Sequence, residues 1–229
     1  MKADKLLCAL SGFLLMVSLL LTVVDGLCFR RSFYEYEYSK NNSAEYIGMS
    51  DEGIMAATDT LLDYLRDKRD DIVVETEVSG YMREVFNERE TLHMIDVKNL
   101  YANAVTARNI MAETGILILA GLLLWKKKMP LTILKQTYLY GLLLLGVIVA
   151  VIAVYALADF TEFWLQFHYI FFDNDLFILD PNTSIMINMF PETFFSDLVF
   201  RIIGVFGGCA LLAGAAVLIP YNRKMKETL

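Results

Sequence analysis

This chain contains only two histidines, and their surroundings suggest proton-transfer chemistry. His93 lies in the stretch TLHMIDVKNL, just before a long apolar run, and His168 lies in the aromatic stretch 163–195, between two apolar runs. Imidazole readily gains and loses a proton near neutral pH, and it often acts as a general acid or base in enzymes. Two imidazoles beside apolar segments therefore predict a catalytic pair at one face of a membrane.

Carboxyl and amide groups near these histidines could orient their rings. Asp96 lies one helical turn after His93, a spacing at which a carboxylate can hold the imidazole tautomer and stabilise the imidazolium. An isolated aspartate at this spacing is also common on a helix surface, so both interpretations stay open. The residues expected to support His168 are Asn174, Asp175 and Asp180. Neither histidine has the neighbours of a standard metal motif, and we expect no metal and no cofactor.

The composition excludes a single soluble domain and predicts a mostly α membrane protein. Of the 229 residues, 56% are hydrophobic, and the mean hydropathy is +0.47. The apolar runs predict four transmembrane helices, at 6–28, 105–125, 138–158 and 198–219. No small-x-small cleavage site follows the first run, so we expect an anchor and not a signal peptide. The cysteines lie in or beside these runs, so the outer region must fold without disulfides.

Basic residues predict the orientation of these helices. The second run ends at Trp125 followed by Lys126, Lys127 and Lys128, and the fourth is followed by Arg223, Lys224 and Lys226. By the positive-inside rule, both termini are cytoplasmic, as are the loop 126–137 and the tail 220–229. Arg30 and Arg31 favour the opposite orientation, but the two larger clusters outweigh them. The segments 29–104 and 159–197 are then the two outer loops.

The first outer loop, 29–104, holds 16 acidic residues against nine basic ones and must fold in water. Its SFYEYEYSK stretch alternates tyrosines with charges from Tyr34 to Tyr38, which predicts a half-buried strand. Ser50 can cap a helix whose apolar positions are Ile54, Thr58, Leu61, Leu62 and Leu65. DIVVETEV, from Asp71, predicts a second strand, and a helix carrying His93 then continues into the membrane. We therefore expect a small extracellular α+β cap.

Polar residues near the outer end of the second span need a partner or a polar cavity. Arg108, Asn109 and Glu113 lie at or below the expected membrane edge near Val105. An unpaired charge at the centre of a membrane helix costs about 2.5–3.5 kcal/mol on insertion scales. Such residues should face the bundle interior. A structural ion pair and a direct role with substrate both remain open for them.

The surroundings of His168 are too aromatic for an ordinary solvated loop. Aromatic residues beside a membrane usually form an interfacial belt. Here they are dense and mixed with acids, which predicts a pocket for a ligand that is part lipid and part polar. The aromatic residues expected to line it are Trp164, Phe167, Phe171, Phe172 and Phe195.

Taken together, these stretches resemble the bacterial lipoprotein intramolecular transacylase family. The resemblance rests on HMIDV at 93–97, FHYIFFDND at 167–175, the pair Asp180–Pro181, and MFPETFF at 189–195. The layout of four helices and two loops matches as well, so the resemblance covers nearly the whole chain. Phe177 is one departure, because we expect a tryptophan there in relatives. That departure concerns the packing of the aromatic lining and not the chemistry.

The resemblance implies an enzyme of the bacterial cell membrane whose substrate is a diacylglyceryl lipoprotein. Its reaction would move the sn-2 acyl chain onto the α-amino group of the amino-terminal cysteine, at the extracellular membrane interface. We assign His93 as base and His168 as hydrogen-bond donor and acid, and the reverse order stays open. Arg108 and Arg201 complete the expected substrate pocket. Membrane lipid is an expected partner and nucleic acid is not; a non-catalytic lipid or peptide sensor and a metal-dependent membrane hydrolase are the alternatives.

Overall fold

A computed structural model describes residues 2–126 and 129–226, and it divides the chain into two compact units. The helix unit contains Met1–Asp25, Ala104–Ala158 and Phe200–Leu229. The loop unit contains Gly26–Asn103 and Asp159–Val199. Lys127 and Lys128 of the basic cluster lie outside the described residues, as do the last three residues of the tail. The side chains beyond Ile219 are also outside the description.

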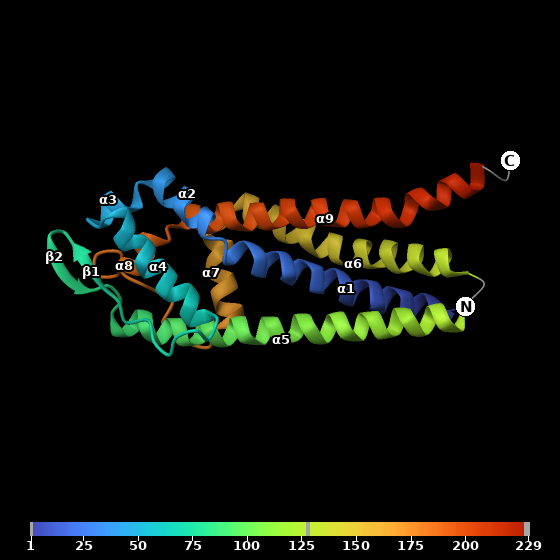
Figure 1. Ribbon diagram of the computed structural model, residues 1–229, viewed down its shortest axis with the longest axis horizontal. Coiled ribbons are helices and arrows are strands. Elements are labelled where there is room, and N and C mark those ends of the chain that lie inside the picture. The colour runs from blue at the N-terminus through green and yellow to red at the C-terminus, as the bar shows by residue number, and fades with distance from the viewer. Residues whose placement is uncertain (1, 127–128, 227–229) are drawn as a thin grey trace. The chain divides into compact units, whose positions relative to one another are not determined.

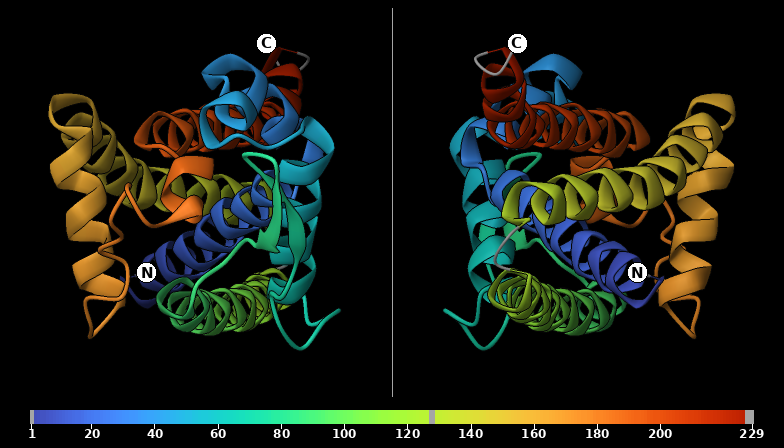
Figure 2. Two further views of the ribbon diagram at one scale, coloured as in Figure 1. Left: turned by 90° about the vertical axis from the view of Figure 1, so that its left-hand side faces the viewer. Right: turned by 90° about the vertical axis from the view of Figure 1, so that its right-hand side faces the viewer.

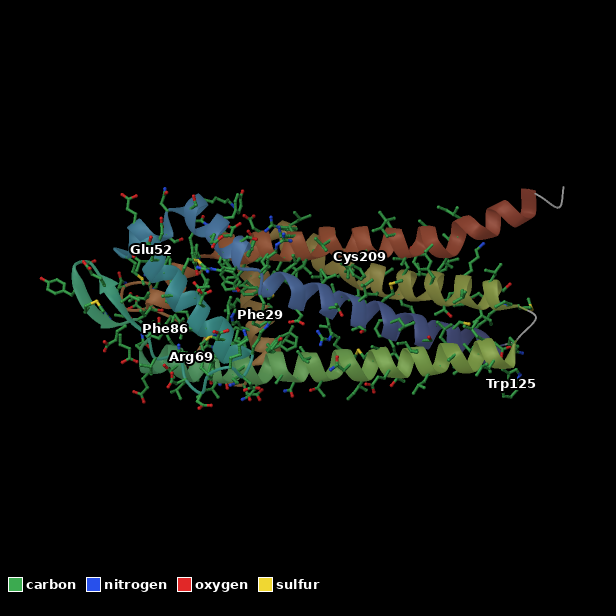
Figure 3. All side chains as sticks on the ribbon, viewed as in Figure 1. Phe29, Glu52, Arg69, Phe86, Trp125 and Cys209 are labelled. Atoms are coloured by element: carbon green, nitrogen blue, oxygen red, sulfur yellow. The ribbon has the colours of Figure 1, made fainter. Side chains whose placement is uncertain are left out.

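Within the part of the chain that the structure describes, four helices are long and apolar enough to cross a membrane, as the sequence predicts. They are α1 (Lys2–Cys28), α5 (Glu88–Trp125), α6 (Pro130–Ala158) and α9 (Glu192–Lys226) (Figure 1). With 38 residues, α5 is much longer than the roughly 20 residues that a membrane requires. Its charged amino-terminal part, with His93, belongs to the loop unit, and its apolar part ends at Trp125 (Figure 3).

Within the helix unit, the four helices form a row in the order α5, α1, α6, α9 (Figures 1 and 2). The closest contact joins α1 and α6, where a Cβ atom on Gly141 would stand 2.3 Å from the Gly12 carbonyl oxygen. Only glycine permits this approach of two backbones. Ser11 Oγ donates to the Gly115 carbonyl at 2.8 Å, which joins α1 to α5. Single polar contacts and small residues therefore hold this unit together.

The loop unit contains five short helices and a hairpin. From the first loop come α2 (Arg31–Asn41), α3 (Ser43–Ile47), α4 (Asp51–Leu65), β1 (Glu75–Val78) and β2 (Tyr81–Glu84). From the second come α7 (Phe160–Phe171) and α8 (Ile185–Met189). The strands pair antiparallel, with Glu75 opposite Glu84 and Val78 opposite Tyr81. The predicted mixture of helix and strand is confirmed, although the sheet has only two strands.

The strand predicted around Tyr34–Tyr38 is wrong, because this segment forms α2. Tyr34 and Tyr38 are four residues apart, so they share one helix face, and both are buried with Phe33 and Glu37. Tyr36, between them, is exposed. Phe190 and Phe194 from the second loop contact Tyr34, with ring centroids 6.2 and 5.3 Å away. These aromatic contacts stabilise the segment as a helix, although its alternating sequence is typical of a strand.

The helix predicted after Ser50 is confirmed, and the next segment is partly different. Ser50 Oγ accepts a hydrogen bond from the Gly53 amide at 3.0 Å, as expected for an N-cap. The strand predicted from Asp71 begins only at Glu75. A hairpin then turns at Ser79 and Gly80, whose φ angles of 52° and 86° suit a tight two-residue turn. The second strand of this hairpin, β2, was not predicted.

Candidate active site

A reciprocal cap sets the start of α5 and therefore the position of His93. The Asn87 amide donates to Glu90 Oε2 at 2.6 Å, and the Glu90 amide donates to Asn87 Oδ1 at 3.0 Å. This is the pattern of a capping box, with asparagine in the place of serine or threonine. His93 follows Glu90 by three residues, on the same side of the helix, and only 8% of its surface is exposed. The cap thus fixes the first turn that carries the histidine.

His168 lies near the end of α7, a helix that was not predicted inside the second loop. Asp159 caps this helix by accepting a hydrogen bond from the Glu162 amide at 2.9 Å. His168 Nδ1 lies 2.7 Å from the Trp164 carbonyl oxygen, one turn earlier. A carbonyl can only accept, so Nδ1 carries the hydrogen and donates it. In the neutral ring, Nε2 is then the free lone pair.

The two imidazole rings are neighbours in the loop unit, as the sequence predicts for a pair. Their centroids are 6.1 Å apart and their planes meet at 34°. Phe172 lies beside both, at 5.3 Å from His93 and 5.7 Å from His168. Phe177, at the position where a tryptophan was expected, stacks on His168 at 4.7 Å and covers one face of the imidazole. The two rings are therefore close enough to belong to one site.

Burial keeps both histidines neutral near pH 7. The pKa of His93 is lowered to about 4, mainly by burial and also by positive charge at His168 and Arg89, while Asp96 acts in the opposite direction. Burial also lowers the pKa of His168, against the hydrogen bond to the Trp164 carbonyl, which raises it. His93 precedes the apolar part of α5, and His168 lies on α7. A neutral imidazole can accept a proton at one nitrogen and donate one at the other.

Asp96 affects His93 through its charge, and its hydrogen bond goes elsewhere. Asp96 Oδ2 accepts from Asn174 Nδ2 at 2.9 Å, which joins α5 to the loop after α7. His93 Nδ1 is buried and has no hydrogen-bond partner among the described residues. Asn174 therefore contributes by holding Asp96. Among the side chains that the structure describes, no three from histidine, cysteine, aspartate and glutamate gather as a metal-binding group.

Asp175 and Asp180 shape the second loop. Asp175 forms an ion pair with Arg89 of α5 at 3.5 Å, and Arg89 also donates to the carbonyls of Asp175 and Ile178. Asp180 Oδ1 accepts from the Asn182 amide at 2.9 Å in a local turn. The contacts of Arg89 anchor the segment after His168 on α5, whereas the turn at Asp180 is local to the loop.

The predicted aromatic residues form a continuous group around His168. Trp164 stacks on Phe195 at 4.4 Å and on Phe167 at 5.0 Å. Phe167 in turn contacts Phe171 at 4.8 Å, and Phe171 is half exposed. The group thus extends from a buried end at the histidines to an exposed end. Such a surface suits an acyl chain that enters from lipid.

Glu90 is a site residue that the sequence analysis missed. Its side chain is fully buried, and Oε1 accepts from Ser184 Oγ at 2.5 Å and from the Met186 amide at 2.8 Å. One carboxylate therefore caps α5 with one oxygen and holds α8 with the other. The capping-box spacing from Asn87 to Glu90 was the available signal in the sequence.

Arg108, Arg201 and Glu113 belong to the helix unit, whereas the histidines belong to the loop unit. Arg108 Nη1 lies 2.7 Å from Asp25 Oδ2, so it forms the structural ion pair that the sequence analysis left open. Arg201 lies exposed on α9. The structure therefore brings together the histidines, the aromatic group, Asp96 and Asn174 in the loop unit, and it places the two arginines in the helix unit.

Comparison with known proteins agrees with this architecture. The family model described as lipoprotein intramolecular transacylase Lit matches residues 9–195. The solved structure of the membrane-integral lipoprotein intramolecular transacylase Lit from Bacillus cereus is 21% identical, with a TM-score of 0.79, and the match covers 100% of this chain and 99% of that chain. A comparison with curated protein sequences gave no significant match.

Two further Bacillus cereus structures contain the same protein with one histidine mutated. The form with arginine is 18% identical, with a TM-score of 0.76 and coverage of 99% and 95%. The form with alanine is 19% identical, with a TM-score of 0.75 and coverage of 100% and 97%. At these identities the structures support the fold alone. The family model covers most of the chain, and it shows that this membrane protein belongs to the lipoprotein intramolecular transacylase family and is an enzyme of that type.

Proposed function

We propose that this transacylase moves the sn-2 acyl chain of a diacylglyceryl lipoprotein onto the α-amino group of its amino-terminal cysteine. The observation that carries the proposal is the pair of neutral histidines, 6.1 Å apart within an aromatic group. An amide bond forms as the ester bond breaks, and one proton passes from nitrogen to the glyceryl oxygen. The product is a lyso-form lipoprotein of unchanged mass. No cofactor is needed to balance this reaction.

Confinement is the first contribution of the site. The attacking ring contains the amino nitrogen, Cα, Cβ, sulfur, two glyceryl carbons, the ester oxygen and the carbonyl carbon, and medium rings of this kind close reluctantly. When the site holds the nitrogen against the ester, much of the entropic cost of closing this ring is already met, which corresponds to a high effective molarity of the amine. Trp164, Phe167 and Phe195 would hold the acyl chain and exclude water. Excluding water also prevents simple hydrolysis of the ester.

The second contribution is proton transfer, and the hydrogen bonds favour the reverse of the assignment made from the sequence. The substrate ammonium, with an ordinary pKa of about 7.7–8.0, must lose a proton before it attacks. His168 donates from Nδ1 to the Trp164 carbonyl, which leaves the Nε2 lone pair as the base. That first proton leaves to solvent, and the second proton, which the nitrogen loses as the amide forms, passes through His168 Nε2 to the departing glyceryl oxygen.

His93 is suited to the other role, that of a neutral hydrogen-bond donor. An unbonded buried acceptor is tolerated better than an unbonded buried N–H group. The hydrogen of His93 therefore belongs on Nε2, since Nδ1 is the buried nitrogen without a partner among the described residues. From Nε2 it can stabilise the oxyanion that forms during attack. Asp96 moderates the pKa of this ring from a distance.

Isotope-labelled substrate tests the proposed reaction. Purified enzyme is given a synthetic lipopeptide whose sn-2 chain carries deuterium. We expect an isomer of identical mass, with the deuterated chain on the cysteine nitrogen. A mixture of two lipopeptides labelled in different parts should give no crossed product, because the transfer stays within one molecule. A free fatty acid as the main product, or crossed products, would contradict the proposal, and a lipopeptide with an acetylated amine is the matched inactive control.

Direct attack by the substrate amine also needs no nucleophile from the enzyme. The variant with Cys8, Cys28 and Cys209 replaced by alanine or serine should keep its activity, since these are all of the cysteines in the chain. Complete loss of turnover in a folded protein would favour an acyl-enzyme intermediate instead.

We further propose that the site faces the outside of the cell, with both termini in the cytoplasm. The basic residues after Trp125 support this orientation. Cysteines introduced into the loops near His93 or His168 should react with an impermeant reagent in intact cells. A cysteine beside Lys126 should react only after the membrane is permeabilised, and labelling there in intact cells would refute the orientation.

A further inference from the structure

The face of α5 that points away from α1 carries a row of exposed side chains, four of which are small or polar. The row contains Thr106, Asn109, Glu113, Ile116 and Ala120, and all five are exposed. The spacings alternate between three and four residues, so the row follows one line along the helix. The opposite face of α5 packs against α1. We name this row the α5 seam.

Glu113 makes the seam unusual for a surface that lipid would cover. It precedes Trp125 by 12 residues, or about 18 Å of helix, within a hydrocarbon layer of about 30 Å. Its carboxyl group forms no hydrogen bond or ion pair with the described residues. Ionisable groups at this depth normally face a protein partner or a polar cavity. A protein partner on the seam would satisfy this need.

Asn109 adds unused hydrogen-bonding capacity one turn away. Its Oδ1 accepts from Arg108 Nε at 3.2 Å, and among the described residues its amide hydrogens have no acceptor. Amides and small residues are the groups that join helices inside membranes. The average spacing of 3.5 residues is that of two helices in a left-handed supercoil. These features together describe one side of a helix–helix interface.

We propose that the α5 seam binds the α5 seam of a second copy of this chain, forming a parallel twofold dimer in the membrane. A second copy has the same orientation, so its seam lies at the same depth. A twofold axis places each seam residue near its own counterpart. Asn109 of one copy then lies one turn from Glu113 of the other and can donate to it. An unrelated helix would need a hydrogen-bond donor within reach of Glu113, whereas Asn109 of a second copy provides one.

Disulfide crosslinking in lipid bilayers tests the seam with Glu113 unchanged. In the variant without the three native cysteines, Ala120→Cys should form a covalent dimer under mild oxidation. Gly121→Cys is the matched control, because this neighbouring residue is also exposed, and a Cβ atom there would have nothing within 4 Å. It points away from the seam and should crosslink only weakly. Equal crosslinking at both positions, or none at Ala120, would overturn the proposal.

Energy transfer between labelled copies in liposomes tests the role of the carboxyl group. Glu113→Leu should weaken association about tenfold, the effect of losing interhelical hydrogen bonds. Glu113→Gln keeps a polar side chain of the same length and should stay within about threefold of the wild type. A wild type that is monomeric at every protein-to-lipid ratio, or a leucine variant that associates normally, would refute the dimer. If thermal unfolding shows that the leucine variant does not fold, the crosslinking pair decides.

Discussion

The helix unit and the loop unit bury polar groups of different kinds. The buried polar side chains described in the helix unit are the hydroxyls of Ser11, Ser18 and Thr137. In the loop unit they include the carboxyl groups of Glu37 and Glu90 and the imidazole of His93. Burying a titratable group is costly unless the surroundings hold it. Under the proposed mechanism, the loop unit carries the chemistry and the helix unit provides the support.

The strongest test of this comparison is to remove the histidines. Replacing either His93 or His168 by alanine should lower turnover of a diacylated lipopeptide by about 10²–10⁴-fold, the range of general acid–base catalysis. The double variant should be little worse than the more damaging single one, because groups that act in one cycle give non-additive losses. Turnover is measured in detergent for all three variants.

Thermal unfolding in the same detergent separates this outcome from a structural effect. If the histidines only stabilise the fold, loss of activity should follow the unfolded fraction of each variant. A folded single variant with near-normal turnover would show that the two-histidine mechanism is wrong. The acids Asp96, Asp173, Asp175 and Asp180 would then be the next residues to test.

The second prediction concerns Glu90, which supports the site without being placed to react. Glu90→Ala leaves Ser184 Oγ and the Met186 amide without their buried acceptor, which should destabilise the protein by about 3–5 kcal/mol. Glu90→Gln retains one carbonyl acceptor and should lose less. The measurement is the unfolding temperature of each variant, with Glu88→Gln as the exposed control in the same turn. Equal unfolding temperatures for all of them would contradict the bridge between α5 and α8.

The third prediction is a pH dependence that originates in the loop unit. His93 has an ordinary pKa of 6.5 when unfolded, and burial lowers it to about 4 in the fold. Between these values the unfolded chain binds a proton that the folded chain does not. The free energy of unfolding should therefore fall as the pH drops from about 6.5 to about 4, by roughly 3 kcal/mol from this group.

His93→Phe isolates this contribution, because the ring is similar in shape and cannot titrate. The stability difference between wild type and variant should change across this pH window and stay constant above it. Other groups titrate in both proteins and cancel in the difference. A constant difference from pH 4 to 8 would show that His93 is not held neutral by burial.

The sequence predicted the helix unit better than the loop unit, for a physical reason. An apolar run of about 20 residues and a cluster of lysines are local signals, and lipid enforces them. The segment at Tyr34–Tyr38 is different, because residues 34 and 38 share a face in a strand and in a helix alike. Packing against Phe190 and Phe194, far along the chain, accompanies the helical choice. Contacts between residues so far apart in the chain cannot be predicted from the local sequence.

Part of the candidate site was also predicted from the sequence, and part was missed. The histidines stood out because the chain has only two, and the aromatic residues stood out by density. Glu90 was missed because an acid in the first turn of a helix is usually exposed, and only the fold brings Ser184 to its second oxygen. The partner of Asp96 was missed for the same reason, since Asn174 is 78 residues away in sequence.

The smallest expected effect tests the support role of the helix unit. Gly141→Ala would place a Cβ atom 2.3 Å from the Gly12 carbonyl oxygen, so α1 and α6 would have to separate. This overpacking should destabilise the protein by about 1–3 kcal/mol. Gly146→Ala on the same helix meets nothing within 4 Å and should be neutral or slightly stabilising. Gly141→Ala should lower the unfolding temperature while turnover per folded molecule stays within about twofold, because no catalytic group moves directly. If turnover falls while the unfolding temperature is unchanged, the helix unit takes part in the reaction, and the contrast between the two units is wrong.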